Sequence, residues 1–272
     1  MLVYSLWKGM VIKMFDTHIH TKPFSLDSEM ELQEVMEKQR ETGICVVLTE
    51  HMDFDLPSPD TYWFDPALYF ETYGPFRSEK LLLGVEIGLQ ILVADKNQKL
   101  IESNPFDMVI AAIHAAKGKD LYDLSYYKMF PDKKSSFMMY LETMYENIRC
   151  FDNFDTLAHI DYVSRKAPYS DPFLHYEEFS EIMDKILLLL AEKEKSLEIN
   201  TRLFDRKEAV DSLRVICKNF YRLGGRTVTI GSDAHKKDKI EMFVKQAYKM
   251  ADECGLTPVY YKERKPYPVN NI

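Results

Sequence analysis

The chain has 272 residues, close to the usual size of one α/β barrel domain. Lys and Arg total 35 against 43 Asp and Glu, so the net charge is -8, and such an acidic surface argues against a protein that coats DNA or RNA. With 46% hydrophobic residues the chain can bury a sizeable core, which excludes a disordered protein. We therefore predict a single globular domain over residues 1–272.

The cysteines and the apolar segments indicate the compartment. The 4 cysteines are far apart and include no C-x-x-C pair, so they predict neither a disulfide framework nor a cysteine zinc site. Lys8 and Lys13 interrupt the apolar start, and no apolar stretch approaches the ~18 residues that a membrane span needs. We expect a cytoplasmic protein without a membrane partner, and the sequence leaves its oligomeric state open.

Short apolar runs alternate along the chain with segments of helical periodicity. The predicted strands, in chain order, are 11–19, 44–49, 81–87, 106–113, 154–160, 196–200 and 226–231. The predicted helices between and after them are 28–42, 66–73, 90–102, 135–150, 176–194, 207–222 and 238–254. Ser28 and Glu31 have capping-box spacing at the start of the first helix, and Gly43 is placed to end it. This alternation predicts parallel strands with right-handed crossovers.

Metal-ligating side chains stand at the ends of these runs. Glu86 lies inside the third run, and six of the 7 histidines come at or just after an apolar run: His18, His20, His51, His114, His159 and His235. In a parallel barrel all strand C-termini open on one face, so these side chains would converge on one pocket. An open doubly wound sheet would also suit seven strand–helix units, but this placement favours an α/β barrel with its site at the C-terminal face.

The residue types indicate a metal cluster. Strand alternation puts His18 and His20 on the same face, about 6–7 Å apart. A single histidine in such a position is more often structural, but metal binding explains the whole set better: His18, His20, Glu86, His114, His159 and Asp233. Histidine and carboxylate ligands without thiolates suit zinc, manganese or iron. The number of ligands predicts two to three divalent ions, with Glu86 as the bridge.

Clustered divalent ions hold phosphate oxygens, lower the pKa of bound water and stabilise in-line attack on phosphorus. The residues therefore predict a hydrolase that acts on a small phosphorylated substrate. Arg165, Arg202 and Arg206 follow predicted strands and could grip the phosphate, although each equally suits an exposed surface position. Asp27 equally suits a metal ligand or a helix N-cap, and we expect His175, in a loop, not to ligate.

The ordered motifs resemble the PHP (polymerase and histidinol phosphatase) superfamily. The H-x-H motif with HTKPFSLDS is followed by TEH, VEIG, AIH, AHID and GSDAH, in the family's order, over residues 16–235. Within this superfamily, the length and the intact motif set are similar to the stand-alone histidinol-phosphatase branch. The resemblance implies a distorted (β/α)7 barrel with a trinuclear metal site at the C-terminal face.

The resemblance also implies a role for each residue. The first ion would be held by His18, His20, Glu86 and Asp233, the second by Glu86, His114 and His159, and the third by Asp27, His51 and His235. Arginines in similar regions of the family contact phosphate, which favours Arg165 over the other two. Asp233, or a neighbouring histidine such as His235, would protonate the leaving group.

The resemblance therefore implies hydrolysis of L-histidinol phosphate in histidine biosynthesis. A phosphoesterase that acts on a nucleotide or another small phosphate ester is an alternative within the same superfamily. A non-catalytic metal-binding regulatory protein is an alternative from another class, and the complete ligand set argues against it. Substrate choice would depend on the loops 52–65 and 117–134, whose aromatic and Asp side chains could close over an imidazole or pack on each other.

Overall fold

A computed structural model describes residues 13–58 and 62–269. Seven parallel strands pair in chain order to form the body of the main sheet. Their bounds are Phe15–Ile19 (β1), Cys45–Met52 (β2), Leu81–Gly88 (β3), Val109–Ala112 (β4), Thr156–Leu157 (β7), Ser196–Asn200 (β8) and Thr227–Gly231 (β9). Each lies within or overlaps a predicted strand, although residues 11 and 12 of the first prediction lie outside the described residues.

The sheet closes on itself near the C-terminal ends of β1 and β9. Ile19 and Ala234 form a parallel bridge, and the backbone N–H of His20 donates to the carbonyl of Ala234 at 2.9 Å. A second bond, 2.8 Å long, runs from the N–H of Asp233 to the carbonyl of His18. The predicted α/β barrel is therefore confirmed.

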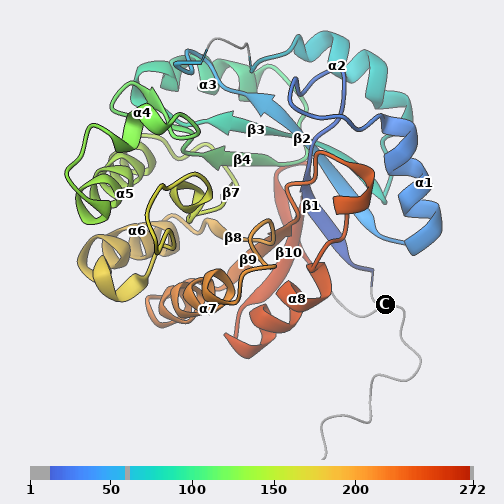
Figure 1. Ribbon diagram of the computed structural model, residues 1–272. Helices are drawn as coiled ribbons and strands as arrows, with labels where there is room; N and C mark the ends of the chain where they lie inside the picture. The colour runs from blue at the N-terminus through green and yellow to red at the C-terminus, as the bar shows by residue number, and fades with distance from the viewer. Residues whose placement is uncertain (1–12, 59–61, 270–272) are drawn as a thin grey trace, which may run out of the picture.

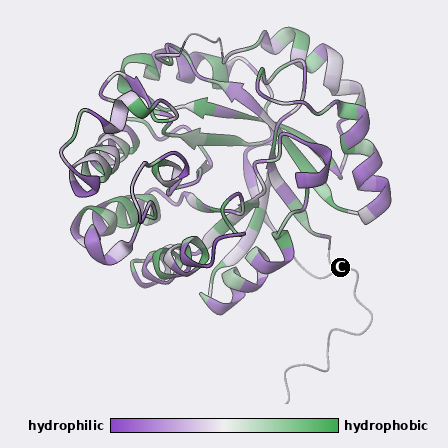
Figure 2. Ribbon diagram, viewed as in Figure 1, coloured by the Kyte–Doolittle hydropathy of each residue, from purple (hydrophilic) through white to green (hydrophobic). Residues whose placement is uncertain are grey.

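Helices surround the strands in chain order, so that the first and last units are neighbours (Figure 1). Their bounds are Leu32–Thr42 (α1), Pro66–Tyr73 (α2), Ala94–Glu102 (α3), Leu124–Tyr127 (α4), Lys133–Cys150 (α5), Ser180–Glu192 (α6), Lys207–Arg222 (α7) and Val244–Glu253 (α8). Figure 2 shows hydrophobic and hydrophilic residues alternating along α5, α6 and α7, as expected of helices that cover a core with one face. Among the described residues, none of the helices combines the length and apolarity needed to cross a membrane.

The ends of α1 agree only in part with the prediction. Gly43 ends the helix in the left-handed conformation at φ 76°, which glycine adopts without strain. The capping box, however, is formed by Glu31 and Glu34, so the predicted start of the helix at Ser28 is wrong. The Ser28 hydroxyl instead donates to the carbonyl of His20 at 2.9 Å, because the chain crosses the mouth of the barrel before the helix begins.

A C-terminal hairpin distorts the barrel. β10 (Thr257–Lys262) pairs with the first residues of β9 and, antiparallel, with β11 (Lys265–Pro268). The Tyr260 ring stacks on Phe15 of β1 at 4.0 Å, and Val259 and Tyr261 belong to the same buried cluster as Phe15. The hairpin therefore fills the N-terminal end of the barrel between β9 and β1. Sequence analysis did not predict it, because its three prolines are typical of loops and sheet edges.

Candidate metal centre

A cavity of about 300 Å³ lies at the C-terminal ends of the strands. Its lining includes Asp27, His51, His114, His159, Asp233 and His235, together with Arg165 and Arg202. His18, His20 and Glu86 lie next to these residues and are almost completely buried, with exposures of 0%, 0% and 1%. The fold thus brings together all nine side chains that the sequence analysis named as metal ligands.

The strands explain this convergence. On β1, the two-residue spacing of His18 and His20 turns both imidazoles to one side, and their Nε2 atoms lie 3.0 Å apart. On the adjacent strands β2 and β3, His51 and Glu86 are partners in register. Asp233 and His235 follow the end of β9, the strand that closes the barrel against β1.

Glu86 lies between two groups of imidazoles. Its Oε2 atom is 3.3 Å from Nε2 of His18 and 3.5 Å from Nε2 of His20. Its Oε1 atom is 2.8 Å from Nε2 of His159 and 3.3 Å from Nε2 of His114. The two carboxylate oxygens therefore face different histidines, which is the arrangement that a bridging ligand requires.

Asp27 marks a third group nearer the cavity mouth. Its Oδ2 atom lies 3.1 Å from Nε2 of His235 and 3.5 Å from Nε2 of His51. The N-cap of α1 is Glu31, so Asp27 does not cap that helix. From the sequence, Asp27 suited either a metal ligand or a helix N-cap, and the fold places it beside the histidines.

The donor set fits divalent metal ions. Several sets of three side chains have potential ligand atoms within 4.8 Å of one another, among them His18–His20–Glu86 and Glu86–His114–His159. Glu86 Oε2 and His51 Nδ1 are buried, lie 2.9 Å apart and make no hydrogen bond of acceptable geometry, as expected of atoms that face an ion. Burial alone would raise the pKa of Glu86, but the charges of His18, His114 and His51 hold it well below its usual range. The carboxylate is thus ionised in the metal-free protein, and bound ions would supply this positive charge once the histidines bind them as neutral ligands.

A second layer of carboxylates orients the imidazoles. Nδ1 of His18 donates to Oε1 of Glu198 at 2.7 Å, and Nδ1 of His114 donates to Oδ1 of Asp53 at 2.8 Å. These bonds leave both Nε2 atoms free to face the centre. Sequence analysis missed Asp53 and Glu198. Glu198 carries the same signal as Glu86, a carboxylate inside an apolar strand, and could have been found by it.

His20 is held through a hydroxyl. The Ser25 hydroxyl donates to Oε2 of Glu50 at 2.6 Å and lies 3.3 Å from Nδ1 of His20. Burial raises the pKa of Glu50 to about 7, although hydrogen bonds from Ser25 and Thr21 oppose this shift. Glu50 therefore supports a histidine from outside the centre.

The three predicted phosphate-binding arginines differ in position. Nη2 of Arg165 lies 2.6 Å from Oδ2 of Asp233, and its side chain is only 7% exposed. Nη1 of Arg202 donates to the carbonyl of Asp233 at 2.9 Å. Arg206, in contrast, is the N-cap residue of α7, is 64% exposed and faces Asp205 at 3.5 Å. Arg206 does not line the cavity, so the structure does not support its predicted contact with phosphate.

His175 belongs to a different part of the molecule. Its Nε2 atom is 3.0 Å from Oδ2 of Asp171, and its Nδ1 atom is 3.1 Å from the hydroxyl of Ser212 on α7. These contacts give the imidazole a structural role in a surface loop, as the sequence analysis expected.

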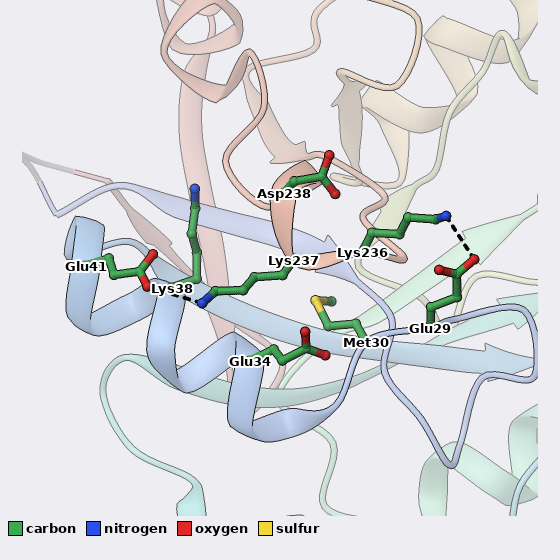
Figure 3. Close-up of a pocket in the computed structure, with 8 residues that line it drawn as sticks. All are labelled: Glu29, Met30, Glu34, Lys38, Glu41, Lys236, Lys237 and Asp238. Carbon is green, nitrogen blue, oxygen red and sulfur yellow. Dashed lines mark hydrogen bonds and ion pairs between the residues drawn. The ribbon is translucent and has the colours of Figure 1, made fainter.

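A larger groove of about 470 Å³ lies outside the barrel, between α1 and the chain that follows His235 (Figure 3). Two of its lysines are paired with carboxylates, Lys236 with Glu29 at 2.9 Å and Lys237 with Glu37 and Glu41 at 3.0 and 3.1 Å. These partly exposed pairs tie the loop after β9 to α1. The smaller cavity, with its buried ligand groups, is the one with catalytic chemistry.

Comparison with known proteins gives consistent results. Residues 16–202 match the PHP domain family. A probable histidinol-phosphatase of Clostridium acetobutylicum is 42% identical over 251 residues, which cover 92% of this chain and 98% of the relative. The histidinol-phosphatase of Lactococcus lactis is 32% identical over 254 residues, which cover 90% of this chain and 92% of the relative.

One solved structure is similar over nearly the whole chain. It is the crystal structure of the Lactococcus lactis histidinol phosphate phosphatase in complex with zinc, L-histidinol and phosphate. The TM-score is 0.89 at 30% identity, and the match covers 94% of this chain and 100% of the other. The similarity therefore extends over the whole barrel fold.

Proposed function

The chain belongs to the histidinol-phosphatases of the PHP domain family, and on that basis we propose that it hydrolyses L-histidinol phosphate to L-histidinol and phosphate. It is a phosphoric monoester hydrolase. This assignment depends on one observation: buried histidine and carboxylate groups lie in the same cavity as Arg165 and Arg202. We place the reaction in cytoplasmic histidine biosynthesis.

Two to three divalent ions, with zinc favoured because the Lactococcus relative binds it, would occupy the centre. We assign the first to His18, His20, Glu86 and Asp233, the second to Glu86, His114 and His159, and the third to Asp27, His51 and His235. When bound, the ions would polarise the phosphate and activate the attacking water.

Side chains of the protein would bind the phosphate and supply a proton to the leaving group. Arg165 and Arg202 stand beside the cluster, and we assign to them the grip on the phosphate oxygens, since guanidinium groups bind phosphate with paired hydrogen bonds. His235 lines the same end of the cavity, and we assign to it the proton that the leaving alkoxide takes up. Burial alone would raise the pKa of Asp233, but the charges of Arg165, Arg202 and His18 hold it well below its usual range. Asp233 is therefore ionised and suits a metal ligand rather than a proton donor. Tyr162 supports Arg165, whose guanidinium carbon lies 4.8 Å from the ring centroid.

Another part of the cavity lining suits the organic part of the substrate. Asp120, at the end of the short strand β6 (Lys119–Asp120), lines the cavity with Tyr122, and neither is fully buried. The Tyr122 N–H donates to Oδ1 of Asp120 at 2.7 Å and so fixes the carboxylate. A carboxylate and two arginines in the lining of one cavity match an ester with an anionic phosphate and a cationic amino group.

The direct test is phosphate release from a panel of phosphomonoesters by the zinc-loaded enzyme. We expect the highest kcat/KM for L-histidinol phosphate, with nucleotides and sugar phosphates poorer by about 10²-fold or more, since they leave Asp120 without a cationic partner. A nucleotide or sugar phosphate with the highest kcat/KM would contradict the proposed substrate but not the phosphatase activity.

Asp120→Asn is expected to separate recognition of the amino group from recognition of the phosphate. The KM for L-histidinol phosphate should rise about tenfold, because a hydrogen bond between charged groups is lost. Hydrolysis of p-nitrophenyl phosphate, which has no amino group, should be unchanged and serves as the control. An equal effect on both substrates would show that Asp120 acts on the centre rather than on the amino group.

A further inference from the structure

Strand β8 carries two polar residues that the proposed reaction does not use. Glu198 and Asn200 are two residues apart, so both side chains leave the same side of the strand, and their exposures are 0% and 3%. Polar groups buried to this extent cost free energy unless they are fully hydrogen-bonded. Their partners therefore indicate what they do.

Glu198 contacts the metal centre at two points that are distant in sequence. Its Oε1 atom accepts a hydrogen bond from Nδ1 of His18 at 2.7 Å. Its Oε2 atom accepts one from the backbone N–H of His159 at 2.8 Å and one from Nδ2 of Asn200 at 3.0 Å. One carboxylate thus fixes the ring of His18 and the backbone of His159, which are both assigned to metal ions.

Asn200 continues the connection to the arginines. Because its Nδ2 atom donates to Glu198, its Oδ1 atom must face the other way. There Oδ1 accepts hydrogen bonds from Nη2 of Arg165 at 3.2 Å and from the backbone N–H of Arg202 at 3.1 Å. Reversing the amide would set donors against the donors of both arginines, so the orientation of Asn200 is determined.

Gly231 on the neighbouring strand β9 is an independent indication. A Cβ atom at this position would lie 2.3 Å from Cβ of His18 and 2.4 Å from Oε1 of Glu198. Both distances are far below van der Waals contact. The strand therefore leaves room for the Glu198–His18 hydrogen bond at a point where any side chain would block it.

We propose that Glu198 and Asn200 are positioning residues that couple the orientation of the metal ligands to that of the phosphate-binding arginines. The part that concerns Arg165 and Arg202 rests on the proposed function, whereas the part that concerns His18 and His159 rests only on metal binding. The two parts make different predictions, so two variants can separate them.

Glu198→Gln tests the metal side. Glutamine offers one acceptor oxygen where Glu198 receives three hydrogen bonds, so its amide group would oppose a donor from His18, His159 or Asn200. We expect zinc affinity, measured by calorimetric titration of the metal-free protein, to fall by about 10- to 100-fold. Circular dichroism would check that the variant folds. Unchanged zinc affinity in a folded variant would overturn this part.

Asn200→Ala tests the phosphate side and decides the proposal if Glu198→Gln does not fold. We expect full zinc content, a KM for L-histidinol phosphate about tenfold higher, a weaker inhibition by inorganic phosphate and a much smaller change in kcat. Inhibition by inorganic phosphate does not involve the organic part of the substrate, so it tests the coupling even if that part is assigned wrongly. Unchanged KM and unchanged phosphate inhibition would overturn the coupling.

Ser196→Ala is the matched control. Ser196 is also buried on β8, but its hydroxyl lies 2.8 Å from that of Thr227 and 2.9 Å from that of Tyr261, at the opposite end of the barrel. The Ser196→Ala variant should have a lower melting temperature but unchanged zinc affinity and KM. If Ser196→Ala alters these two quantities as the other variants do, their effects come from loss of strand stability and the proposal fails.

Discussion

Glu86→Gln is expected to lose two ions together and to reduce kcat/KM by about 10³-fold. The two oxygens of Glu86 face different groups, with Oε1 2.8 Å from Nε2 of His159 and Oε2 3.3 Å from Nε2 of His18. Glutamine keeps the shape but replaces one oxygen with an amide group that cannot bind a metal ion. A loss of about 4 kcal/mol of transition-state stabilisation, which is in the range of metal-ion catalysis, corresponds to that factor.

The measurement is the number of zinc ions per chain in the purified variant, together with kcat/KM for L-histidinol phosphate. Asp27→Asn is the control, because Asp27 is 39% exposed and contacts only the group nearest the cavity mouth. We expect it to retain the ions held by the buried groups and to lose much less activity. A Glu86→Gln protein with a full metal complement would exclude the bridge.

Arg165→Ala is expected to reduce kcat/KM by about 10²-fold, mainly through KM. The Arg165 side chain is 7% exposed, and its Nη2 atom lies 2.6 Å from Oδ2 of Asp233, beside the centre. The variant would lose a charged hydrogen bond to the phosphate in a nearly dry site, which costs about 1.5–3 kcal/mol. Metal content should be unchanged, because removing a competing cation leaves the Asp233 carboxylate available as a ligand.

Arg206→Ala is the matched control for this experiment. It removes the same side chain from an exposed position next to α7, where the only ion pair given by the structure is with the adjacent Asp205. An exposed pair of this kind contributes little to stability, so kcat, KM and metal content should all remain at the values of the unaltered enzyme. Equal losses in the two variants would show that Arg165 acts through overall charge rather than through contact with phosphate.

The sequence predicted the barrel and, together with the family resemblance, named the nine side chains that the fold brings together. Helix and strand periods are local properties, so all seven strand–helix units could be predicted from apolar spacing. Parallel strands then bring their C-terminal ends to one face, and this is why the positions of His18, His114 and Asp233 at strand ends predicted a common centre before any distance was known.

Only the tertiary structure decided how the centre is supported. Glu198 and His18 are separated by 180 positions, and their contact depends on the closure of the barrel and on the space above Gly231. Arg165 and Arg206 follow strands in a similar way, yet one is buried and the other exposed. No local pattern separates them, because burial depends on the direction in which each loop returns over the barrel mouth.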